Sequence, residues 1–241
     1  MVIDFEPALT SKMIVLGVDT TTAEQCLAVA EGDRLLTERR ELIHTNHTET
    51  LLANIDIVLR EAGIRPTADL QALAVVNGPG SFTGIRIGMA TVRGLADSWG
   101  IPVVPLDALH LLAAASALPD GIIIPVLDAR RQHYYCAVYH RQAGVPQPIE
   151  SGLELTATEV IDLLRVYATP IVIGPGTAFL AQECPPPAWS YSLRPSPEES
   201  PAFLAARLTA GLSPAALRQA AGTFDAFYIR PPDIRRPAVP R

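Results

Sequence analysis

The chain has 241 residues, of which 49% are hydrophobic, so it is long and apolar enough to bury a core in one large domain or two lobes. Its formal net charge of −6 gives no broad positive field, which argues against strong unaided binding to a phosphate backbone. Its three cysteines are scattered and lack the spacing of a zinc site or a disulfide framework. The sequence also shows no signal peptide or membrane span, so we expect a cytoplasmic protein.

The first predicted elements are three strands. Residues 1–12 precede the regular pattern, and we expect them to form a flexible extension. Residues 13–19 are a short β-branched apolar run that ends at Asp19 in a polar turn, which is typical of a buried strand. The runs 26–30 and 35–42 are strand-like and flank a glycine-containing turn, so they predict a hairpin.

Two helices and two further strands follow. From residue 47 to 61 apolar residues recur at spacings of three and four, which predicts an amphipathic helix. A strand at 70–76 leads through a glycine-rich loop into a second helix at about 85–99, and 101–104 resumes a strand. The predicted elements thus follow the order three strands, helix, strand, helix, strand. This order favours a mixed sheet with helices packed on it.

The second half of the chain repeats the first in outline. The apolar strand at 122–128 again ends in an aspartate, Asp128, and a second strand-like run follows it. Later, residues 171–177 echo residues 75–81, with an apolar strand running into Gly-Pro-Gly and a hydroxyl residue. We therefore predict two related lobes, the second reduced. The predicted boundaries are 1–12 for the extension, 13–105 for the N-terminal lobe, 106–230 for the C-terminal lobe and 231–241 for an extended tail.

The glycine loop carries a family resemblance. Residues 78–88, GPGSFTGIRIG, resemble the hallmark of the TsaB (YeaZ) family, which belongs to the actin-like ATPase superfamily. Further matches are DTTT at 19–22, HTETLL at 47–52, LDAR at 127–130 and FYIR at 227–230. The resemblance implies an α/β fold of two ribonuclease-H-like lobes with mixed sheets. It also implies a part in making N6-threonylcarbamoyladenosine beside the anticodon of tRNA.

The same resemblance implies the partners. The chain would be a non-catalytic subunit that binds and positions a TsaD-like catalytic subunit as a heterodimer. A TsaE-like ATPase would assist, tRNA would be reached through the complex, and a homodimer is possible when the chain is alone. Catalytic relatives carry a His-x-x-x-His metal pair where this chain has only His110. We therefore expect no catalytic residue, metal or tightly bound cofactor here, and assign ATP and the metal to the partner subunits.

The partner interface is predicted on the two helices of the N-terminal lobe. Gly84, Gly88 and Gly94 each cost a helix about 1 kcal/mol relative to alanine, which close approach of another backbone would explain. The alternative is that these glycines admit the lobe's own sheet. The candidate interface residues are His47, Leu51, Leu52, Ile55, Gly84, Ile85, Arg86, Gly88, Met89, Val92 and Arg93.

A vestigial nucleotide or loop site is also predicted. Its residues are Asp19, Thr20, Gly78, Gly80, Ser81 and Asp128. Glycines let backbone amides approach a phosphate, but no Gly-Lys-Ser/Thr follows, and turn chemistry accounts for Asp19 and Thr20 equally well. The alternative function is an active ATP-dependent enzyme of small-molecule kinase type, with Asp19 and Asp128 at the cleft. The sole support for a peptidase role is a serine in a glycine-rich turn.

Overall fold

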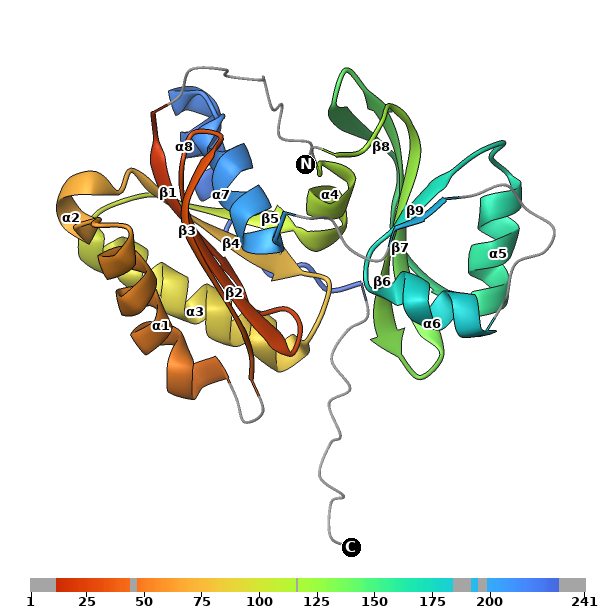
Figure 1. The fold of residues 1–241 in the computed structure, drawn as a ribbon, viewed down its shortest axis with the longest axis horizontal. Coiled ribbons are helices and arrows are strands. Elements are labelled where there is room, and N and C mark those ends of the chain that lie inside the picture. Colours follow the sequence, from red (N-terminus) through yellow and green to blue (C-terminus); the bar gives the residue numbers. More distant parts are fainter. Residues whose placement is uncertain (1–11, 44–46, 116, 184–191, 195–198, 230–241) are drawn as a thin grey trace, which may run out of the picture.

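The computed structural model describes residues 12–43, 47–115, 117–183, 192–194 and 199–229. The predicted extension, apart from Lys12, and the predicted tail lie outside the described residues. Two lobes stand side by side, each built on one five-stranded sheet (Figure 1). No helix in the described part of the chain is both long and apolar enough to span a bilayer.

The first lobe follows the predicted order of elements, with one unpredicted short helix, Pro66–Asp69, added. Its members are β1 (Ile14–Asp19), β2 (Glu24–Glu31), β3 (Arg34–Leu42), α1 (His47–Glu61), α2 (Pro66–Asp69), β4 (Ala72–Gly78), α3 (Phe82–Trp99) and β5 (Val103–Asp107). The strands lie in the order β3-β2-β1-β4-β5, with β1 antiparallel to β2 and parallel to β4. A short helix, α4 (Ala108–Ala113), leads out of this lobe.

The second lobe repeats this topology. Its members are β6 (Gly121–Arg130), β7 (His133–Gln142), β8 (Val145–Thr156), α5 (Ala157–Arg165), β9 (Ile171–Ile173), α6 (Gly176–Glu183) and β10 (Ser192–Arg194). The order is β10-β9-β6-β7-β8, with β6 antiparallel to β7 and parallel to β9. Counted from its own first strand, this is the order of the first lobe. The predicted α/β fold of two related lobes with mixed sheets is confirmed, and the three-residue β9 and β10 make the second lobe the reduced one.

The chain then returns to the first lobe. Helices α7 (Pro201–Ala210) and α8 (Pro214–Ala221) pack against β1, β2, β4 and β5. A Cβ added to Gly17 of β1 would lie 2.0 Å from the Ala202 carbonyl oxygen, so the α7 backbone rests directly on this strand. Our predicted C-terminal lobe, 106–230, included residues 201–221 and so placed them in the wrong lobe, because the repeat in the sequence gives no sign of the crossing.

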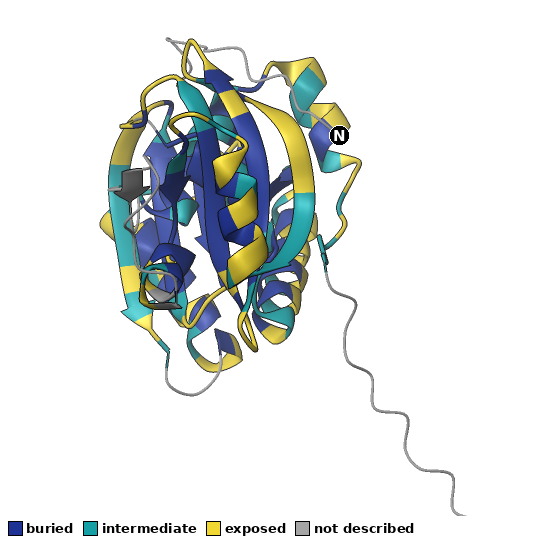
Figure 2. Cartoon of the chain, turned by 90° about the vertical axis from the view of Figure 1, so that its right-hand side faces the viewer, coloured by how far each residue is buried: buried dark blue, intermediate teal, exposed yellow. Residues whose placement is uncertain are grey.

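Side-chain alternation along the strands builds five layers. Leu16 and Val18 of β1 join the core beneath α1 and α3, whereas Val15 joins the core shared with α4 and α7. That central core continues into the second sheet through Ile123 of β6, so α4 and α7 lie between the two sheets (Figure 1). On the outer side of the second sheet, α5 and α6 cover β6 and β7, whose central residues are buried (Figure 2).

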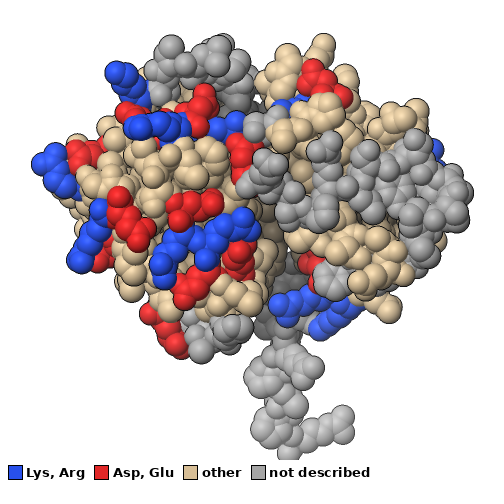
Figure 3. Space-filling model, in the orientation of Figure 1, with Lys and Arg blue, Asp and Glu red and all other residues tan. Residues whose placement is uncertain are grey.

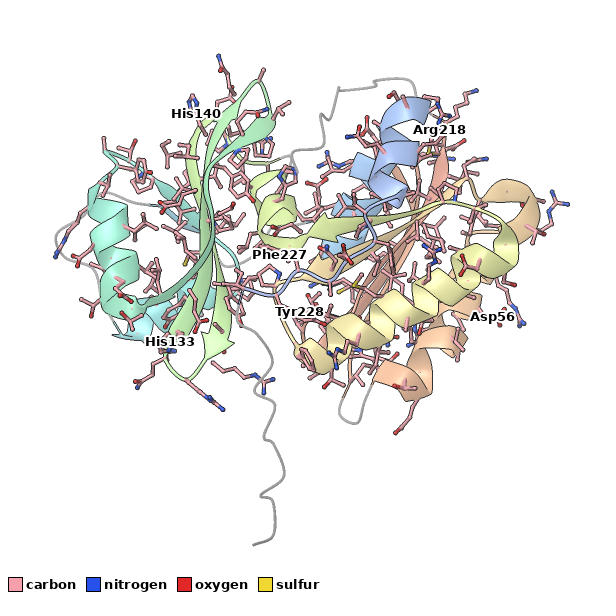
Figure 4. The ribbon with its side chains drawn as sticks, turned by 180° about the vertical axis from the view of Figure 1, so that it is seen from behind. Asp56, His133, His140, Arg218, Phe227 and Tyr228 are labelled. Carbon is pink, nitrogen blue, oxygen red and sulfur yellow. The ribbon has the colours of Figure 1, made fainter. Side chains whose placement is uncertain are left out.

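The turn between β6 and β7 is strained. Arg131 and Gln132 have φ values of 55° and 61°, and Arg130 precedes them at 62° (the adjoining His133 is labelled in Figure 4). Two central residues at positive φ define the hairpin turn that normally takes Asn-Gly, because a Cβ is disfavoured there. We expect Gln132→Gly to raise the free energy of unfolding by about 1 kcal/mol in urea denaturation. The control Gln147→Gly, on the exposed part of β8, should lower it, and an equal loss in both variants would contradict the strain.

Candidate functional site: the glycine loop and the outer helices

The glycine loop rests on the turn that follows β1. The Ser81 amide donates to the Thr21 carbonyl at 2.6 Å, and the Thr20 hydroxyl donates to the Gly84 carbonyl at 2.8 Å. A Cβ on Gly80 would lie 2.5 Å from the Thr21 oxygen, and one on Gly84 would lie 2.0 Å from the Thr20 oxygen. These glycines therefore allow contact between two segments of the same lobe.

The amides of this loop are used within the chain. Besides the Ser81 amide, the Gly84 amide donates to the Ser81 hydroxyl at 3.2 Å, which caps α3, and the Ile85 amide donates to the Ser81 carbonyl at 2.8 Å. A phosphate cradle needs such donors to point at an anion. As folded, these three amides point at their own chain, so the arrangement favours the structural interpretation of the loop.

The two strand-end aspartates occupy equivalent turns. Asp19 accepts from the Thr21 amide at 2.8 Å, and Asp128 accepts from the Arg130 amide at 2.7 Å, so each closes a turn two residues on. Asp19 is buried, and desolvation raises the pKa of its carboxyl, whereas Asp128 is exposed. The structure thus brings Asp19 and Thr20 to the glycine loop and places Asp128 at the matching turn of the second lobe.

Gly78 begins the loop at a contact with the end of the chain. Its φ is +118°, and an added Cβ would lie 2.4 Å from the Phe227 carbonyl oxygen. The Phe227 amide donates to the Asn77 carbonyl at 2.9 Å, and the Asn77 side chain donates to the Asp225 carbonyl at 2.8 Å. The segment around Phe227 and Tyr228 therefore runs beside the loop (Figure 4).

Eight of the eleven predicted interface residues are buried in this chain's own packing. The buried ones are His47, Leu51, Ile55, Gly84, Ile85, Gly88, Met89 and Val92. Their burial leaves little surface for a partner, because the spacing that marks an interface helix equally marks the face turned to a helix's own sheet. Leu52, at 58% exposure, and Arg86 and Arg93 are exposed. Any interface on these helices must use their outer faces.

His47 anchors the start of α1. Its Nε2 lies 2.9 Å from the Thr22 carbonyl oxygen, which can only accept, so Nε2 carries the proton. Its Nδ1 then accepts from the Gln25 side-chain amide at 3.4 Å, and Gln25 in turn accepts from Asn54 at 2.7 Å. This buried network joins β2 to α1 and gives His47 a structural role.

Arg86 on α3 sits against the C-terminal segment. Its guanidinium carbon lies 3.7 Å from the centre of the Phe82 ring, and its Nε donates to the Tyr228 hydroxyl at 3.3 Å. The Phe82 and Tyr228 rings lie 5.2 Å apart. From the sequence, Tyr228 belonged only to a motif near the chain end, and no spacing rule could place it beside α3.

His110 is the single histidine at the position where the family resemblance implies a metal pair in catalytic relatives. It is partly buried on α4 with its ring edge-on to Tyr139, the ring centres 5.7 Å apart, and desolvation lowers its pKa to about 4. Asp107 caps the same helix by accepting from the Leu109 and His110 amides, and burial raises its pKa to about 6. Among the residues that the structure describes, no three His, Cys, Asp or Glu side chains gather as a metal site would require.

The depressed pKa of His110 makes stability depend on pH. Between pH 6.5 and pH 4 the unfolded chain takes up a proton at this ring and the folded chain does not, so stability falls as the pH falls. At 1.36 kcal/mol per pH unit, the loss reaches about 3 kcal/mol. We expect His110→Gln to lack this loss of unfolding free energy. Urea unfolding of both proteins at about pH 7 and pH 4 should therefore show a smaller drop in stability for the variant. The raised pKa of Asp107 has the opposite effect on stability as the pH falls, but Asp107 is present in both proteins, so its effect cancels in the comparison. A pH-independent difference would contradict the assignment.

Comparison with known proteins places this geometry in a family. The family model described as "TsaD: tRNA N6-adenosine threonylcarbamoyltransferase" matches residues 40–159. The tRNA threonylcarbamoyladenosine biosynthesis protein TsaB of Bacillus subtilis is 28% identical over 160 residues, which cover 66% of this chain and 69% of that protein. The Escherichia coli protein of the same name is 34% identical over 131 residues, covering 54% of this chain and 56% of the relative.

A solved structure agrees over almost the whole fold. The structure titled "YeaZ from Pseudomonas aeruginosa" superposes with a TM-score of 0.69 at 25% identity and covers 90% of this chain and 99% of its own. The resemblance drawn from the glycine loop is thereby confirmed. The chain belongs to the TsaB (YeaZ) family.

Proposed function

We propose that this chain is a non-catalytic subunit of the machinery that makes tRNA N6-threonylcarbamoyladenosine, and that it binds and positions a TsaD-like transferase. The observation that carries the proposal is the joint match to relatives named for TsaB and to a TsaD family model. A chain that resembles both proteins has the fold to pair with the transferase through equivalent surfaces.

Two features of the site support a non-catalytic role. The amides of Ser81, Gly84 and Ile85 in the glycine loop are taken up by the chain itself. Where the resemblance implies a metal pair in catalytic relatives there is one partly buried imidazole, His110, which cannot supply two ligands. In this proposal ATP and the metal belong to the partner subunits, and a TsaE-like ATPase acts on the assembled pair.

The pairing surface of the proposal is the outer side of α1 and α3, which pack against each other along the first lobe. Leu52 on α1 is the large apolar side chain exposed there, at 58%. When no transferase is present, the same surface could pair with itself across a two-fold axis, which accounts for a homodimer of the isolated chain.

The test is reconstitution with the TsaD-like protein of the same organism. We expect the two purified chains to elute as one complex of defined mass. Threonylcarbamoyl transfer to tRNA should require the complex together with the TsaE-like ATPase and ATP. The isolated chain should hold no stoichiometric iron or zinc and bind tRNA only weakly, because its net charge is −6. Transfer activity by the chain alone, or two chains that elute separately, would overturn the proposal.

The kinase-type alternative has its own outcome in the same preparation. Tight, magnesium-dependent ATP binding with turnover by the isolated chain would favour an active enzyme with Asp19 at its site. The packing of Asp19 against the Thr21 amide favours the subunit role instead.

A further inference from the structure

Most arginines in the described part of the chain face an acidic partner. Nine of them form ion pairs: Arg34, Arg39, Arg40, Arg60, Arg65, Arg93, Arg141, Arg165 and Arg207. Acidic and basic groups are accordingly intermingled over the first lobe (Figure 3). Arg86 is different, because it is exposed and its contacts are to an aromatic ring and a phenol. Its charge is left without a counter-ion among the described residues.

The Arg86 side chain is nevertheless held in place. Its guanidinium carbon lies 3.7 Å from the centre of the Phe82 ring, and its Nε donates a hydrogen bond to the Tyr228 hydroxyl at 3.3 Å. Stacking and one hydrogen bond orient the group and reduce the side-chain entropy that a later contact would cost. The terminal Nη groups remain as donors, and their spacing matches the two oxygens of a carboxylate.

The surroundings of Arg86 suit a protein partner. One turn along α3 stands the small, exposed Ala90, and beyond it Arg93 is neutralised by Asp97 at 3.2 Å. An arginine held against aromatic side chains beside an exposed small residue is a composition found at interface hot spots. A polyanion such as RNA would need several free cations, and here Arg93 is already paired.

We infer that Arg86, oriented by Phe82 and Tyr228, is the anchor of the heterodimer interface and takes up an aspartate or glutamate carboxylate of the TsaD-like partner. The inference rests on the proposed function and adds to it the chemistry of the contact. Arg86 acts as the binding cation, while Phe82 and Tyr228 are positioning residues that touch the partner only through it.

The first experiment measures the dissociation constant of the pair by titration calorimetry. We expect Arg86→Gln to weaken binding about 30-fold, in the range for a truncated charged hydrogen bond at an interface. Tyr228→Phe, which removes only the orienting hydroxyl, should weaken it about 5-fold. The matched control is Arg218→Gln on α8, which removes an exposed arginine far from Tyr228 and should leave binding within about 2-fold (Figure 4). Circular dichroism and urea unfolding should show all three variants folded.

A charge exchange identifies the partner group. Arg86→Glu should abolish detectable binding, and one variant among arginine substitutions of acidic residues on the partner should restore it. If the wild-type chains do not bind each other, the proposed function fails. If they bind and Arg86→Gln is as tight as wild type, the inference fails alone. If Arg86→Gln instead weakens binding of isolated tRNA and leaves the protein pair intact, the anion is a phosphate and the carboxylate assignment is overturned.

Discussion

Gly84→Ala is expected to lower the free energy of unfolding by about 4 kcal/mol or more, enough to unfold a marginally stable domain. The added Cβ would lie 2.0 Å from the Thr20 carbonyl oxygen, which belongs to the backbone and cannot rotate away. Moving α3 outward to relieve this overlap would also break the hydrogen bond from the Thr20 hydroxyl to Gly84. Chemical unfolding followed by circular dichroism measures the loss.

The control lies in the same helix. Nothing is within 4 Å of a Cβ on Gly94, so Gly94→Ala should stabilise the protein by up to about 1 kcal/mol through helix propensity. We also expect Gly88→Leu to destabilise the fold, since its Cβ would lie 2.3 Å from the Thr20 hydroxyl. If Gly84→Ala were as stable as wild type but failed to bind the transferase, the glycines would face the partner after all.

Arg141→Ala should cost about 4 kcal/mol of stability, the second large effect. This side chain is 5% exposed on β7 and donates to the carbonyls of Ala113 and Ala115 at the end of α4. Arg207 of α7 donates to the Ala114 carbonyl beside them at 3.3 Å. Two arginines from different elements thus satisfy the last carbonyls of one short helix, and the favourable interaction with its negative end adds to these bonds.

The matched control is Arg165→Ala. Arg165 pairs with Asp162 three residues before it, and both side chains are more than 60% exposed, so its loss should change stability by less than about 1 kcal/mol. Thermal unfolding of both variants gives the comparison. Equal, small losses would mean that α4 keeps its place without the Arg141 contacts.

Much of this fold follows from patterns in the sequence. The strand that ends at Asp19 and the helix that begins at His47 were predicted from apolar spacing, and both exist. The recurrence of an apolar strand with a terminal aspartate predicted the second lobe, and the equal turns at Asp19 and Asp128 explain why the repeat is visible. Local chemistry sets these features, so local reasoning finds them.

Whether a helix face turns toward the core or toward a partner could not be predicted in the same way. An apolar residue such as Met89, or a glycine such as Gly88, is equally suited to the core and to an interface, and only the packed structure shows that both turn inward. Helices α7 and α8 were missed, although Ser200-Pro201 and Ser213-Pro214 are typical helix starts with a cap and a first-turn proline. Their return to the first sheet depends on contacts between residues far apart in the chain.

That return of α7 to β1 has a consequence during protein synthesis. Helix α7 covers the face of the first sheet that includes Gly17 and Ala28, and its residues leave the ribosome about 180 positions after those strands. Until then, the part of this face over β1 and β2 lacks the helix that covers it. Folding to the native state must therefore wait for closure of a long loop, which makes this lobe slow to form and dependent on protection from aggregation while the second lobe is being made.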